Sequence, residues 1–311
     1  MSKRLTATLA MALLVALAPA AFAGGAKHYP NGAESFWMGA APPPGLYFMD
    51  YNMFYDSHEF MDAGGDEVKA GPLAGFKANV YANVPRFIWI TDKQIFGANY
   101  GMHLFVPIMD IDVKTRFAHD HQTGLGDIIF DPFILSWHWK TFHLTTAVDI
   151  YAPTGEFDQG NMANPGLNLW TFEPIVAFTW QFVENVPLSF SMKFMYDFNT
   201  KNSQGTSPLT GMEADVTPGQ ELHFDYSLDY MINDTWKVGV TGYLYHQTTL
   251  DEVNGSHLSG DVGKRSETFA IGPAVEWHMG KLFLRGTYTH EINSRNMPLA
   301  QTFWLTLTCI F

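Results

Sequence analysis

Apolar and polar side chains alternate with a period of two along most of the chain after residue 44. The final stretch, residues 301–311, is a clear example. One face of it carries Phe303, Leu305, Leu307, Cys309 and Phe311, and the other carries Thr302, Trp304, Thr306, Thr308 and Ile310. Because successive side chains of a strand point to opposite faces, this period indicates a β-strand with different surroundings on its two sides. The pattern fits either a soluble β-sandwich or a strand whose apolar face contacts lipid.

The same alternation predicts twelve strands joined by connections of two kinds. The strands are expected at residues 46–55, 76–89, 95–111, 124–139, 142–152, 169–182, 188–198, 220–232, 236–247, 267–278, 282–291 and 301–311. Short connections follow the even-numbered strands, and longer loops follow the odd-numbered ones. Outer-membrane barrels have this arrangement, with tight periplasmic turns and longer extracellular loops. The sequence therefore predicts an all-β protein, a transmembrane antiparallel β-barrel of about twelve strands whose last strand pairs with its first.

The composition supports a barrel and excludes several other classes of protein. After residue 23 the chain has no apolar run of the roughly 18 residues that a transmembrane helix needs. Aromatic residues make up 15% of the chain, while apolar and polar positions cancel in a mean hydropathy of −0.06. The formal net charge is −13, and such an acidic surface should repel nucleic acid, whose binding needs basic patches. A single cysteine leaves no internal disulfide.

The chain is expected to have three parts. Residues 1–23 have the features of a secretory signal peptide, because Lys3 and Arg4 precede an apolar run that ends in a small-residue cleavage pattern. Residues 24–44 form a lead-in segment, and residues 45–311 form the barrel.

The lead-in segment is not expected to be a strand. It ends in three consecutive prolines, which cannot donate the hydrogen bonds of a strand ladder. The segment lies either in the periplasm or inside the barrel, where it would plug the lumen. The second placement is favoured because Phe36, Trp37 and Met38 need to be covered from water.

Charged and polar residues on the strands are predicted to line the lumen, since Lys or Arg facing lipid costs roughly 2–4 kcal/mol at the membrane midplane. The lumen candidates are Asp50, Asn79, Asp149, Glu173, Lys193, His223, Asp225, Asp229, Lys237, Tyr243, Tyr245, Glu276 and Arg285. Because both signs of charge occur in a narrow space, we interpret them mainly as structural ion pairs, with a solute-binding role left open. Tyr243 and Tyr245 either form part of an aromatic path or fill space.

Several short motifs resemble those of a known family. Residues 28–34 (HYPNGAE) and 42–47 (PPPGLY) are similar to the start of the phenol-degradation meta-pathway family of outer-membrane, transporter-like proteins. Residues 124–127 (GLGD), 153–155 (PTG) and the strand that contains Trp170 resemble further landmarks of that family. The resemblance spans nearly the whole chain after the signal peptide. It implies uptake of aromatic or other hydrophobic small molecules, and it assigns no catalytic or binding residues.

The predicted function is a passive channel in the bacterial outer membrane for a small hydrophobic or aromatic solute. Its expected partners are membrane lipid and that solute, without a cofactor, with oligomeric state open. One alternative is an outer-membrane hydrolase that acts on a lipid or ester, but Ser136 and His138 on one strand face do not make a catalytic triad. Another is a structural or adhesive barrel that acts through its loops. His119 and His121 have a spacing that can hold a metal, but we interpret them as solvated loop residues, with no metal site.

Overall fold

The structure is a computed structural model that describes residues 28–182, 186–207, 211–257 and 265–311. The predicted signal peptide lies outside the described residues. The regular structure is entirely β-strand in these four ranges. Among the described residues, no helix has the length and apolar character needed to cross a membrane.

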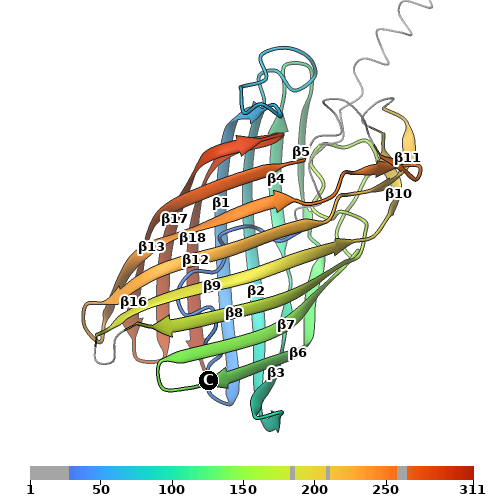
Figure 1. The fold of residues 1–311 in the computed structure, drawn as a ribbon. Coiled ribbons are helices and arrows are strands. Elements are labelled where there is room, and N and C mark those ends of the chain that lie inside the picture. The colour runs from blue at the N-terminus through green and yellow to red at the C-terminus, as the bar shows by residue number, and fades with distance from the viewer. Residues whose placement is uncertain (1–27, 183–185, 208–210, 258–264) are drawn as a thin grey trace, which may run out of the picture.

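Fourteen strands form one antiparallel sheet that curls into a barrel (Figure 1). They are β1 (Gly45–Met61), β2 (Lys77–Ile95), β3 (Ala98–Phe105), β4 (Ile108–Lys114), β5 (His119–Leu125), β6 (Ile128–His138), β7 (Phe142–Ala152), β8 (Thr171–Gln181), β9 (Leu188–Asn199), β12 (Glu221–Met231), β13 (Trp236–Gln247), β16 (Glu267–Met279), β17 (Leu282–Arg295) and β18 (Met297–Ile310). A separate loop sheet contains β10 (Asn202–Thr206), β11 (Glu213–Thr217), β14 (Glu252–Val253) and β15 (Ser256–His257).

Two of the barrel strands are each interrupted once. β3 and β4 both pair with β2 and are separated by residues 106–107. β5 and β6 pair with β4 and β3 and are separated by residues 126–127. When each interrupted pair is counted as one strand, the fourteen strands of the sheet become twelve. The prediction of an antiparallel barrel of about twelve strands is confirmed.

The first and last strands close the barrel. β1 pairs with β18 from Tyr47 opposite Ile310 to Met61 opposite Met297, and its other edge pairs with β2. The faces of β18 are as the alternation predicts, because Trp304 is 2% exposed inside the barrel and Phe303 is 42% exposed outside. Joining the ends of the sheet satisfies backbone groups that would otherwise face lipid without partners.

Cys309 is expected to react from the lipid side of the barrel. It is half-buried on β18 between the outward-facing Phe48 and Leu282. In detergent-solubilised or reconstituted protein, a lipid-soluble thiol reagent should label Cys309 much faster than a charged aqueous reagent. A cysteine moved to Thr308, on the inner face, should reverse this preference. Equal labelling of the two positions by the aqueous reagent would contradict the assignment of the faces.

The two ends of the barrel differ in their connections. Only residues 96–97 separate β2 from β3, and residues 280–281 separate β16 from β17. Figure 1 shows the short turns and the C-terminus at one end, and the long connections with the loop sheet at the other. The loop sheet was not expected, because its segments carry polar sequences without a period-two pattern.

The predictions for Asp50 and Asn79 are wrong, because both residues lie on the outward face. Their chain neighbours Tyr51 and Ala78 point inward and are 2% and 5% exposed. On this side of the barrel the inner faces of β1 and β2 are apolar except at Arg86 and Ser57, and Tyr51 packs there with residues that include Trp304. The prediction used polarity alone and therefore gave these two strands the wrong orientation.

The outward polar groups of β1 and β2 hydrogen-bond to one another. Asp50 accepts bonds from the amide nitrogens of Asn83 and Asn52, at 2.8 and 3.0 Å. The Tyr81 hydroxyl donates to Asn52 at 2.8 Å. Mutual hydrogen bonding reduces the penalty of facing these groups away from the lumen.

His119 and His121 lie on β5 and not in a loop. The Nε2 atom of His119 is 2.7 Å from Asp112, and that of His121 is 2.6 Å from Asp110, across the hairpin on β4. On the exposed outer face, each imidazole is thus paired with its own carboxylate. The two rings are not directed toward a shared ion.

Candidate functional site

Residues 28–44, here called the inner segment, run inside the barrel against its inner wall (Figure 1). Near its start, the two ring nitrogens of His28 lie 2.8 Å from Asp127 and 2.6 Å from the Thr171 hydroxyl. Farther along, the Gly39 amide donates to the Thr179 hydroxyl at 3.0 Å. A side chain at Gly39 would overlap the backbone of β8, so the close approach requires glycine.

Asp225 on β12 is the main anchor of the inner segment. Its carboxylate accepts hydrogen bonds from the Tyr29 hydroxyl at 2.5 Å, the Gly32 amide at 2.9 Å and the Glu34 amide at 3.2 Å. Asp225 is fully buried. A buried carboxylate is stable only when it is well supplied with donors, and the inner segment supplies these.

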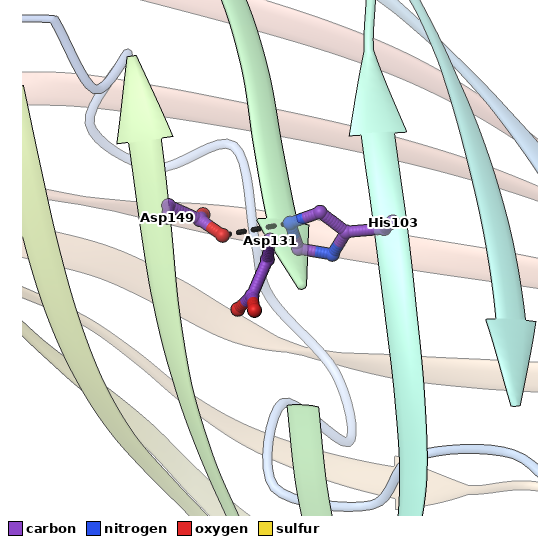
Figure 2. Close-up of side chains that lie close together, drawn as sticks. All are labelled: His103, Asp131 and Asp149. Carbon is purple, nitrogen blue, oxygen red and sulfur yellow. Dashed lines mark hydrogen bonds and ion pairs between the residues drawn. The ribbon is translucent and has the colours of Figure 1, made fainter. Parts of the chain in front are cut away.

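A chain of charged groups continues from the inner segment into the wall. Glu34 pairs with Arg86 at 2.9 Å, and Arg86 lies 2.8 Å from Nδ1 of His103. Nε2 of His103 lies 2.7 Å from Asp149 on β7, as Figure 2 shows. This series of side-chain contacts links three strands to the inner segment. It also pairs charges that would be costly to bury singly.

Cationic side chains cover the aromatic part of the inner segment. The Lys237 ammonium lies 4.9 Å from the ring centre of Trp37 and 5.4 Å from that of Phe36. The Arg285 guanidinium lies 5.5 Å from the Phe36 ring and pairs with Glu276 at 2.6 Å. Cations over ring faces are attracted to them, so these contacts hold the segment to β13 and β17.

Two cavities lie in the barrel on either side of the inner segment. The outer cavity has a volume of about 330 Å³ and is lined by Tyr29 and Pro30 together with residues near the long loops. The inner cavity has a volume of about 420 Å³ and is lined by Glu34 and residues near the short turns. Between them is a space of only about 30 Å³, lined by Tyr29, Pro30, Ala33 and Glu34. Residues 29–34 therefore form the constriction.

The outer cavity suits a small apolar molecule. Its wall is mainly apolar and includes Val80, Ala82, Val84, Met109 and Trp304. An apolar cavity of about 150 Å³ holds benzene, and ligand pockets in proteins are typically about 300–1,000 Å³. The space is therefore large enough for a small aromatic compound.

Eleven of the thirteen residues predicted to line the lumen lie on the inner face, and they fall into three groups. Lys193, Lys237, Glu276 and Arg285 line the inner cavity. Tyr243 lines the outer cavity and Asp149 the small space between the two. Glu173, His223, Asp225, Asp229 and Tyr245 are packed into the wall, outside the linings of all three spaces, and at most 2% exposed.

Several interior polar residues were not among the predicted lumen candidates. They are Tyr29, Glu34, Arg86, His103, Asp127, Asp197 and Glu221. A signal for Arg86 was present, because the cost of facing arginine toward lipid fixes the orientation of β2. Asn79 lies seven positions before Arg86 on the same strand. Because an odd spacing puts two strand residues on opposite faces, an inward Arg86 would have predicted an outward Asn79. The residues of the inner segment carried no such signal, since they follow no strand pattern.

Comparisons with known proteins agree with this architecture. Among solved structures, the chain is similar to the COG4313 outer membrane channel from Pseudomonas putida F1, with a TM-score of 0.77 and 14% identity over 89% of this chain and 99% of that one. It is also similar to the translocator domain of the autotransporter NalP from Neisseria meningitidis, with a TM-score of 0.52 and 10% identity over 88% and 91%. No curated protein matches the chain.

The fold and its relatives place the protein in the bacterial outer membrane, as predicted. The family resemblance is confirmed as well. The sequence model described as "Putative MetA-pathway of phenol degradation" matches residues 57–307, which is more than half of the chain. The chain therefore belongs to this family of phenol-degradation MetA-pathway proteins.

Proposed function

We propose that the protein is a passive channel that carries a small hydrophobic or aromatic molecule across the outer membrane. The observation that carries this proposal is the pair of cavities on either side of residues 29–34. The family description, which refers to phenol degradation, and the channel named among the similar structures support the same function. The partners in this proposal are the membrane lipid around the barrel and the solute within it.

The inner segment is the plug of this channel. Its contacts with Asp225, Arg86 and Lys237 occupy the middle of the lumen, so a solute in the outer cavity reaches the inner cavity only when residues 29–34 shift. The apolar lining of the outer cavity favours entry of a hydrophobic molecule through burial of its surface. The charges near the plug hold the segment in place and are not the binding site for the solute.

The hydrolase alternative has less support. The Ser136 hydroxyl is 3.3 Å from Nε2 of His138, but Nδ1 of His138 lies 2.9 Å from the ring of His143. A catalytic base is normally oriented by a carboxylate or similar group, and the hydrogen-bond partners of His138 within the described residues are Ser136 and His143. Ser136 is also buried beneath the contact between Thr145 and Gly39. The similar structure from Pseudomonas putida F1 is described as an outer membrane channel, which favours the channel over the hydrolase.

Filling the outer cavity should slow the passage of an aromatic solute. In Ala82→Trp, the indole would enter the apolar part of the cavity, because Ala82 points inward and is buried. We expect the flux of a small aromatic compound such as phenol into proteoliposomes to fall severalfold. The matched control is Tyr81→Trp, which changes the adjacent outward position and should leave the flux unchanged.

Flux measurements test separately whether the outer cavity lies on the solute path and whether the protein is a channel. Equal flux through Ala82→Trp and the unaltered protein would show that the outer cavity is not on the solute path. If neither the full chain nor a variant without the inner segment passes any small solute, the protein is not a channel.

A further inference from the structure

A row of acidic side chains crosses the inner wall opposite the cavities. Asp197 on β9 lies directly opposite Glu221 on β12. The pairings of β8 with β9 on both sides of Glu173 place this residue at the same level on the other side of Asp197. His223 follows on the same face of β12. Glu173 and Asp197 are 0% exposed, and Glu221 and His223 are 1% exposed.

Glu173, Asp197 and His223 have fewer hydrogen-bond partners than buried ionisable groups require. Among the described residues, no hydrogen-bond partner reaches Oε1 of Glu173, either carboxylate oxygen of Asp197 or either ring nitrogen of His223. The Tyr151 hydroxyl donates to the remaining oxygen of Glu173 at 3.1 Å. A cluster of buried ionisable groups without donors is unstable unless a proton or a cation lies between them.

The distances suit ligands of one ion better than hydrogen-bonded partners. Nε2 of His223 is 3.3 Å from Oδ1 of Asp197 and 3.6 Å from Oε2 of Glu173. The ligand atoms of the three residues all lie within 4.8 Å of one another. Two ligands bound tetrahedrally to zinc at about 2.1 Å are about 3.4 Å apart, which agrees with both distances to the imidazole.

The second histidine–carboxylate cluster of the barrel provides an internal comparison. In Figure 2, His103 points to Asp149, and the Asp131 carboxylate turns away from both. Both ring nitrogens of His103 are engaged, by Asp149 and Arg86, and Asp131 accepts bonds from the backbone amides of Phe133 and Val148. This cluster is satisfied by the protein itself and does not need an ion.

Charge balance also favours a cation at the cluster of Glu173, Asp197 and His223. The ion pairs of Glu173 and Asp197 within the described residues are with His223, not with lysine or arginine. Asp149, which lies opposite Glu173 on β7, extends the acidic row but has His103 and Arg86 nearby. A divalent ion would offset most of the negative charge that Glu173, Asp197 and Glu221 bring together.

We propose that Glu173, Asp197 and His223 bind one divalent transition-metal ion, with zinc as the best match. Imidazole nitrogen combined with carboxylate oxygen suits zinc, whereas an all-oxygen site would suit magnesium or calcium. The ion joins β8, β9 and β12 on the inner wall. It also fixes the His223 ring, whose centre is 5.1 Å from that of Tyr29 in the inner segment. The site does not depend on which solute passes through the barrel.

The test is metal content after refolding, because full burial of the ligands requires the ion to enter as the barrel forms. The mature chain is refolded after chelator treatment, with zinc or manganese added singly, and desalted. Bound metal is measured by mass spectrometry. One equivalent of zinc per chain is expected, together with a higher midpoint of urea unfolding than for protein refolded in chelator. Cobalt refolded into the same site should give the visible absorption bands of a tetrahedral complex.

Two sets of variants distinguish zinc bound at the buried site from zinc bound by surface histidines. Asp197→Asn and His223→Gln keep the side-chain size and should lose the bound zinc and the zinc-dependent shift in midpoint. A double variant, His119→Ala with His121→Ala, removes exposed imidazoles on β5 and should retain one equivalent. A heat-dependent shift in gel migration shows whether each variant has formed the barrel.

Two results would overturn the proposal. One is full zinc content in folded His223→Gln, or its loss in the β5 double variant, since either places the metal elsewhere. The other is unaltered protein that binds neither metal after refolding, which would mean that shared protons neutralise the carboxylates.

Discussion

Deletion of residues 28–40 is expected to raise the single-channel conductance severalfold and to admit solutes that the full chain excludes. The barrel wall should survive this change, because the ladder from β1 to β18 closes without any residue of the inner segment. Barrels of about eight strands are filled by side chains and those of about sixteen hold open channels, so twelve strands leave a lumen that a short segment can block. Arg86, Lys193 and Asp225 would then face water.

Planar bilayer recordings of the two refolded proteins measure the effect. A second variant replaces residues 28–40 with a glycine–serine linker of equal length, which keeps the connection but removes the contacts with the wall. Both variants should conduct more than the full chain. If both show heat-dependent gel migration and yet conduct no more than the full chain, residues 28–40 do not block the lumen.

The period-two pattern was sufficient to predict the barrel because it arises from strand geometry itself. Each strand of a closed sheet has one face toward lipid and one toward the interior, so the alternation recurs wherever the two environments differ. One strand departs from the regular alternation, because the pairing of β6 with β7 shifts between Phe130 and Leu135. Asp131 itself is buried and held by backbone amides.

The orientation of a strand was less predictable than its existence. For β1 and β2 the polar face is outside, with Asp50 bonded to Asn83, and the apolar face packs inward. The assumption that polar side chains face the lumen fails where the interior is filled by protein and not by water. Arg86 was the better guide, because an unpaired guanidinium in lipid costs more than an amide that has a hydrogen-bonded neighbour.

The clusters that cross strands could not be predicted from one sequence. Asp197 lies 24 positions after Glu173 and 24 positions before Glu221, yet the three meet because of the pairing register of β8, β9 and β12. Register depends on turn and loop geometry, which the alternation does not specify. The contacts of Asp225 with the inner segment were equally unpredictable, since these partners belong to a segment without a strand pattern.

Asp225→Ala is expected to release the inner segment without shortening the chain. Hydrogen bonds to charged groups contribute roughly 1.5–3 kcal/mol each, so the loss of the three bonds from Tyr29, Gly32 and Glu34 weakens docking by roughly 4.5–9 kcal/mol. A change of about 5.5 kcal/mol is enough to move a two-state equilibrium from 1:99 to 99:1. Recordings should therefore show frequent openings to a conductance close to that of the deletion variant.

The control is Asp229→Ala, four residues along the same face of β12. Asp229 is also buried, but its hydrogen bond from Ser189 and its ion pair with Lys237 do not involve the inner segment. Its loss should leave the channel mostly closed. Asp225→Asn keeps one acceptor oxygen and should fall between the two alanine variants.

A combined variant distinguishes anchoring from a direct effect of the charge on conductance. If Asp225 acts by holding the inner segment, then Asp225→Ala should add little conductance in protein that already lacks residues 28–40, because the interaction has been removed on both sides. An equal increase in both backgrounds would mean that the carboxylate itself limits ion passage. A closed channel in Asp225→Ala, indistinguishable from Asp229→Ala, would move the anchor to the pair between Glu34 and Arg86.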